Sequence, residues 1–184
     1  GLLAAQSSVQ AVAVSSAKEQ LQASLRDAMN DMTRELMTAT RRAVPALNIQ
    51  ALAVNGATLT FQTPTTDAVN SILDPNTGVR WCNPPITYTF INEDTGAGAA
   101  AGNARLDAGE DANNDRALTR CILRTWNGQS RVMGAANDLS EAAFSLNDPN
   151  NDVLTITLTA SRRVGMRTQH VITATATSRV YLAN

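Results

Sequence analysis

An acidic loop holds the residues whose types and spacing could best bind a ligand. Side chains with oxygen atoms recur there at short intervals: Asp107, Glu110, Asp111, Asn113 and Asp115. The last three alternate along the chain, which is how calcium loops direct ligands to one centre. A standard EF-hand is excluded, because Arg116 stands where it needs Gly and Ile122 where it needs Glu. The spacing predicts a non-EF calcium loop, with Asp107 or Glu110 as the extra carboxylate, and the alternative is a solvated acidic loop at a hairpin tip.

Two cysteines, Cys82 and Cys121, provide the second possible chemistry, and each lies in a β-like stretch. Zinc binding is disfavoured, because the chain has a single histidine and no C-x-x-C pair. A disulfide closing a loop of about forty residues would contribute about 4 kcal/mol in the chain-entropy account. We therefore predict a Cys82–Cys121 disulfide, which would place the protein outside the cytoplasm. Two buried free thiols are the alternative.

No group of residues has the pattern of a catalytic site. His170 is the only histidine, and no serine is marked as its nucleophile. The glycines of residues 96–102 do not fit the spacing of a dinucleotide-binding loop. The acidic loop has no aromatic platform for a sugar. The sequence therefore predicts that the protein is not an enzyme.

Charge argues against a nucleic-acid partner, and hydropathy argues against a membrane-spanning segment. The chain of 184 residues has a formal net charge of −1 and a pI near 5.8. We expect no nucleic-acid partner, because such proteins carry a basic surface. The sequence contains no apolar run of about eighteen residues, so these residues include no predicted membrane span.

A long N-terminal helix is the first element that must position these groups. Strong helix formers fill Gln6 to Arg42, and neither Gly nor Pro occurs between Leu2 and Val44. At ~1.5 Å per residue this helix would be roughly 50 to 60 Å long. Apolar residues recur on one face: Leu21, Leu25, Met29, Met32, Leu36 and Ala43. We expect this half to dock on the chain's own sheet, and Leu2 to Lys18 to project or contact other subunits.

Strand signals dominate after Pro45. Alternating apolar and polar residues predict strands at 57–63, 86–91, 118–126, 152–160 and 170–182. Asn127-Gly128 predicts a tight hairpin turn. The predicted fold class is α+β, with the long helix packed on antiparallel sheet. The predicted organisation is a helix over residues 1–44 and a β-rich head over 45–184, with the acidic loop at 92–116.

Several short patterns resemble the soluble part of type IV pilin-like proteins, in particular minor pilins and pseudopilins of the W and J types. They are Met32–Ala43, Ile86–Phe90, Leu118–Arg120 with its hairpin, Ala142–Leu146 and Thr177–Asn184. The acidic segment also resembles insertions seen in such proteins, and a calcium ion bound there would then be structural, ordering the loop. Gly1 to Ala5 looks like the end of their apolar helix, although their Gly-Phe-Thr-Leu-x-Glu cleavage signature is not in this sequence. The resemblance implies a pilin-like fold.

The same resemblance implies a subunit of a bacterial type IV pilus or type II secretion filament, at or near its tip. Its partners would be other minor pilins or pseudopilins and the major pilin. A missing N-terminal segment would anchor it in the inner membrane before assembly at the cell surface or in the periplasm. Subunit packing would involve Val9, Val12, Leu21 and Leu25. The alternative is a secreted, calcium-binding adhesive or ligand-binding module with a helical stalk.

Overall fold

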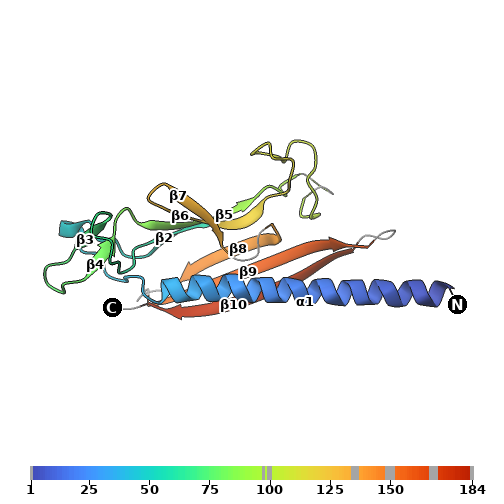
Figure 1. Ribbon diagram of the computed structural model, residues 1–184, viewed down its shortest axis with the longest axis horizontal. Coiled ribbons are helices and arrows are strands. Elements are labelled where there is room, and N and C mark those ends of the chain that lie inside the picture. Colours follow the sequence, from blue (N-terminus) through green and yellow to red (C-terminus); the bar gives the residue numbers. More distant parts are fainter. Residues whose placement is uncertain are drawn as a thin grey trace.

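A computed structural model describes residues 2–96, 98, 101–133, 137–147, 152–165 and 170–182, with side chains from Val9 onward. The chain begins with one α-helix, α1 (Leu2–Leu36), followed by a short 3-10 helix, η1 (Pro45–Leu47). The strands of the described residues then form three antiparallel sheets. Figure 1 shows α1 lying along one side of these sheets, with its N-terminal end extending past them.

The largest sheet has five strands in the order β1-β2-β5-β6-β7. Its members are β1 (Ala53–Asn55), β2 (Thr58–Phe61), β5 (Ile86–Asn92), β6 (Arg120–Trp126) and β7 (Gln129–Met133). The turn between β6 and β7 confirms the predicted hairpin, because Trp126 pairs with Gln129 across it. Asn127 and Gly128 both have positive φ, as this tight turn requires.

The other two sheets are smaller. A three-stranded sheet has the order β10-β9-β8, with β8 (Leu139–Leu146), β9 (Val153–Val164) and β10 (His170–Tyr181). A two-stranded sheet pairs β3 (Ser71–Leu73) with β4 (Arg80–Cys82). The predicted strands at 152–160 and 170–182 are confirmed, with Leu154, Ile156 and Leu158 buried on one face of β9.

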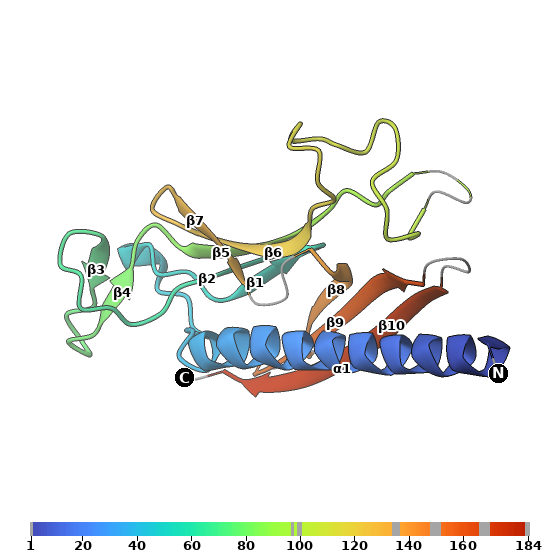
Figure 2. The ribbon, with the colours of Figure 1, turned by 45° about the vertical axis from the view of Figure 1, so that its right-hand side comes forward.

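One core joins the helix to both larger sheets. The helix packs mainly on β9 and β10, and Figure 2 shows it crossing them. Its buried side chains meet apolar residues of β2, β5 and β6, where the Phe61 and Tyr88 rings make an edge contact with centroids 4.9 Å apart. Each fully buried Leu or Met contributes about 1.5–3 kcal/mol. The prediction that the second half of the helix docks on its own sheet is therefore confirmed.

The helix ends earlier than predicted, at Leu36 rather than Arg42. Two threonines explain the difference, because their hydroxyls bond the local backbone and so compete with helical hydrogen bonds. The Thr38 hydroxyl donates to the Glu35 carbonyl at 2.8 Å. The Thr40 hydroxyl accepts the Arg42 N–H at 3.1 Å. Residues 37–43 consequently form turns and bends that lead the chain into the sheets.

The predicted fold class, α+β and pilin-like, is wrong. The described chain is predominantly antiparallel sheet, divided into three sheets, with a single α-helix at the N-terminus. Alternation along a strand reports which side chains share a face, but not which strand lies beside it. No local pattern in the sequence therefore shows that β7 and β8 belong to different sheets. For this reason the sequence predicts a single sheet covered by the helix.

Candidate functional site

The N-terminal half of α1 is the candidate functional surface. Val9 is 69% exposed and Val12 is 68% exposed, and their role in subunit packing stays a prediction. Residues 9–16 are all exposed except the half-buried Val14, and Ala17 is the first buried residue among the helix residues with described side chains. The helix before Ala17 is roughly 20 Å long. It extends past the described ends of β9 and β10 (Figure 1).

This exposed half differs chemically from the rest of the helix. Its residues 9–16 are Val, Gln, Ala and Ser, and the first charged residue of the chain is Lys18. Protein surfaces that remain in water are normally rich in charge, whereas the centres of protein interfaces are depleted of it. The short side chains also allow a second helix or strand to approach closely. The surface therefore has the composition of a contact region.

The other two predicted subunit-packing residues have a different place. Leu21 is 0% exposed and Leu25 is 1% exposed, and both belong to the core beneath the helix. Their assignment to contacts between subunits is therefore wrong. The 3.6-residue period places them on the same face as Met32 and Leu36, which the sheets of the same chain already cover.

An ion pair and a second polar contact fix the docked half of α1 in one orientation. Near its end, Glu35 accepts two hydrogen bonds from the Arg124 guanidinium, at 2.9 Å from Nε and 2.5 Å from Nη2, and one from the Tyr88 hydroxyl. Burial raises the pKa of Glu35, but the hydrogen bonds from Arg124 and Tyr88 outweigh it and leave the pKa below its usual value. Burial and the nearby Glu35 charge raise the pKa of Tyr88.

A second polar contact holds the middle of the helix. Arg162 of β9 donates from Nη1 to the Gln20 side-chain oxygen at 2.8 Å. The same guanidinium forms two hydrogen bonds with the Asp138 carboxylate. Gln20 and Glu35 lie fifteen residues apart, so the two contacts are roughly 22 Å apart along the axis. The exposed half is therefore the continuation of a helix whose direction is fixed by the head.

In the acidic loop, the alternating side chains accept hydrogen bonds from backbone N–H groups. Asp111 accepts the N–H groups of Asp115 and Arg116, each at 3.0 Å. Asn113 also accepts the Asp115 N–H, at 2.9 Å, and Asp115 accepts the Ala117 N–H at 2.7 Å. The structure thus brings Asp111, Asn113 and Asp115 together in one exposed turn. Hydrogen bonds to backbone stabilise this turn.

Asp107 and Glu110 belong to a separate, more buried part of the loop. Glu110 accepts the Gly96 N–H at 2.6 Å and the Asp107 N–H at 2.8 Å, while Asp107 accepts from Asn103 and pairs with Arg105. Among the residues that the structure describes, no cluster of three or more acidic, His or Cys side chains is arranged to hold a metal ion. Calcium binding stays a prediction.

Beneath the loop lies a buried polar network that sequence reasoning missed. Arg120 is 2% exposed and pairs with Asp94 at 3.2 Å. Its guanidinium also donates to the Ser161 hydroxyl at 2.9 Å and carbonyl at 2.8 Å. Asp94 further accepts the backbone N–H groups of Asn103 and Ala104. Arg120 therefore ties the loop, β6 and the three-stranded sheet together, and nothing local distinguishes it from an exposed strand arginine.

The predicted disulfide is not formed: Cys82 and Cys121 are both buried, free thiols. Cys82 lies four residues before β5 begins, whereas Cys121 pairs with Ile91 near the end of β5. Ile86, at the Cys82 end of β5, and Ile91, beside Cys121, are five strand residues apart, which is about 17 Å. A disulfide needs Cα atoms within about 7 Å. Burial and the Glu93 charge raise the pKa of the Cys121 thiol.

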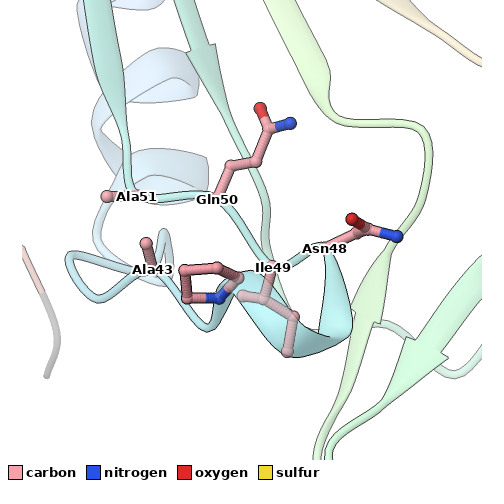
Figure 3. Close-up of a pocket in the computed structure, with 6 residues that line it drawn as sticks. Ala43, Asn48, Ile49, Gln50 and Ala51 are labelled. Atoms are coloured by element: carbon pink, nitrogen blue, oxygen red, sulfur yellow. The ribbon is translucent and has the colours of Figure 1, made fainter.

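A small pocket beside η1 offers no obvious chemistry. It has a volume of about 330 Å³ and is lined by Ala43, Pro45, Asn48, Ile49, Gln50 and Ala51. Figure 3 shows Asn48 and Gln50 as its polar side chains. No lining residue is ionisable or nucleophilic, so this pocket has no group for acid–base or covalent catalysis.

Comparison with known proteins assigns no family. No family model, curated protein or solved structure matches the chain. The pilin-like part of the fold prediction therefore gains no support from any known fold. None of the described helices combines the length and hydropathy needed to cross a membrane.

Proposed function

We propose that the protein is a structural subunit of a bacterial filament, as a minor pilin or pseudopilin of a type IV pilus or type II secretion system at or near the filament tip. Its partners would be other minor subunits and the major pilin, and it would be held at the inner membrane before assembly. This role rests on the helix and its exposed half, and not on any likeness of fold.

One observation carries this proposal: an uncharged, exposed helix half continues a helix that the head holds firmly. Val9 and Val12 are exposed, while Leu21, only nine residues beyond Val12, is fully buried. Charge depletion favours contact with protein over contact with water. Because Glu35 and Gln20 fix the helix direction, a partner that binds its N-terminal half also fixes the orientation of the head.

Site-specific photocrosslinking in the producing bacterium tests the proposal. A photoreactive residue at Val12 should form adducts with other filament subunits, identified by mass spectrometry of the assembled fraction. The matched control is Asn30, which is exposed on the docked half of the same helix and should give few adducts. Equal adducts at both positions, or none with filament subunits, would contradict the assembly role.

Processing provides an independent test. The product of the natural gene should be expressed with and without prepilin peptidase, and its mature N-terminus read by mass spectrometry. Peptidase-dependent cleavage is the expected result. Cleavage by ordinary signal peptidase alone would favour a secreted protein over a filament subunit.

A further inference from the structure

The free edge of β10 is unlike the other edges of the two larger sheets. It pairs with β9 over twelve residues without a register shift, and no other described strand lies along its second edge. The edge strand β1 has three residues, and β7 has five with Arg131 exposed. The edge strand β8 has an irregular register between Leu139 and Glu141. Short length, charge and irregular register protect sheet edges from pairing, and of these β10 has only the charge of Arg179 near its C-terminal end.

The sequence of β10 suits regular pairing. From Val171 to Ser178 it contains no charged residue, Gly or Pro. On the face away from α1, Thr175 and Thr177 are exposed, and their hydroxyls contact those of Thr159 and Thr157 on β9, each at 3.3 Å. Threonine fits the pleat of a sheet well. The strand is therefore long and uninterrupted, and it carries no charge from Val171 to Ser178.

The helix leaves this edge open. Ala174 and Val180 of β10 are buried on the face where α1 packs. Figures 1 and 2 both show α1 crossing the face of the sheet, with no described strand on the outer side of β10. The unpaired backbone groups of β10 therefore point sideways, in the plane of the sheet.

Two exposed apolar residues give the edge a two-fold pattern. Val171 is 45% exposed and Tyr181 is 73% exposed, and both lie on the threonine face. They stand at equal distances on either side of Ala176. If two copies of β10 pair antiparallel about Ala176, each Val171 lies opposite the partner's Tyr181. Aromatic and β-branched residues form favourable cross-strand pairs.

We propose that β10 pairs antiparallel with β10 of a second copy of this chain, giving one continuous six-stranded sheet with its two-fold axis at Ala176. In this register Thr175 lies opposite Thr177, and Arg179 lies opposite Thr173, so no like charges meet. Antiparallel pairing keeps the threonine faces of both copies on the same side of the sheet. This self-association uses a different surface from the helix-based assembly proposed above and does not depend on it.

Disulfide crosslinking tests the register directly. Val171→Cys and Tyr181→Cys variants, made separately with different tags, should form a mixed crosslinked dimer under mild oxidation. Each variant alone is the control, because identical positions lie about 33 Å apart in this register. The buried Cys82 and Cys121 are the same in every sample. The proposal would be overturned if the mixture gave no crosslinked mixed dimer, or no more crosslinked dimer than either variant gives alone.

Charge placed on the edge tests the association. In Thr175→Lys with Thr177→Lys, two lysines of one copy would face two of the other, and like charges directly opposite destabilise a sheet. Sedimentation equilibrium should show a concentration-dependent dimer for the natural chain and an affinity at least about tenfold lower for this variant. A matched control is Ala143→Lys with Ser145→Lys, on the same sheet face but at the β8 edge.

A helix variant and the behaviour of the natural chain distinguish pairing through β10 from association through the helix. Val12→Lys alters only the exposed helix half and should leave the β10 dimer intact; loss of the dimer in this variant would assign the association to the helix instead. A natural chain that stays monomeric at all concentrations, or a β10 lysine variant that associates as well as its control, would refute edge pairing. Circular dichroism shows whether each variant is folded. If the lysine variant is unfolded, the disulfide crosslinking of the cysteine variants alone tests edge pairing.

Discussion

Replacement of Arg120 by Met should be among the most damaging single changes in the head. The substitution removes the guanidinium from Asp94, whose side chain is 1% exposed, and from the Ser161 carbonyl. Loss of one partner of a buried ion pair costs about 3–5 kcal/mol. Asp94 keeps hydrogen bonds from Asn103 and Ala104, which favours the lower end, about 3 kcal/mol. At about 2–4 °C per kcal/mol for a domain of this size, the melting temperature should fall by about 6–12 °C.

Urea unfolding followed by circular dichroism measures this cost, and a double-mutant cycle assigns its origin. Asp94→Asn added to Arg120→Met should recover at least about 1 kcal/mol, because the uncompensated buried charge is removed. The control is Arg162→Met: the Arg162 side chain is 36% exposed in its pair with Asp138, and the pair should contribute about 1 kcal/mol or less. Equal costs for the two arginine variants, or no recovery in the double variant, would refute the view that Arg120 joins the loop to the sheets.

Three other predictions follow from the described contacts. Because the folded state holds the pKa of Glu35 below its usual value of 4.5, the unfolded chain binds the proton first as the pH falls. The stability advantage over Glu35→Gln in urea unfolding should therefore be full above about pH 5 and disappear at lower pH; a difference independent of pH would contradict this. Thiol titration of the denatured, unreduced protein should find both Cys82 and Cys121 reactive, whereas no reactive thiol would indicate a disulfide. Calcium should raise the melting temperature of the natural chain but not of Asp111→Ala with Asp115→Ala, and an equal rise in both would exclude this loop as the site.

The parts of the fold that could be predicted are those with a strong local signal. The helix follows from a long run without Gly or Pro and from apolar residues at helical spacing. The hairpin follows from Asn127-Gly128, because few other dipeptides adopt positive φ at both positions. In β9, the alternation of Leu154, Ile156 and Leu158 with threonines gives both the strand and its buried face.

The remaining features depend on contacts between residues far apart in the sequence. Cys82 and Cys121 both lie in strands, but only the register of β5 and β6 shows how far apart they are. Arg120 looks like an exposed strand residue until Asp94 and Ser161 are placed beside it. The acidic loop has the carboxylate spacing of a calcium loop, but its carboxylates accept hydrogen bonds from backbone N–H groups, which side-chain spacing does not reveal.

The two halves of α1 also differ in what keeps them helical. Forming the first turn of a helix is unfavourable, and each later residue adds only a small gain, with a propagation constant of about 1–1.6. The docked half, from Ala17 to Leu36, supplies the nucleus through its packing in the core. The preceding turns extend from that nucleus with a free energy close to zero. A neighbouring subunit that covers them therefore adds contact energy to a helix already started, and binding and helix extension become one coupled equilibrium.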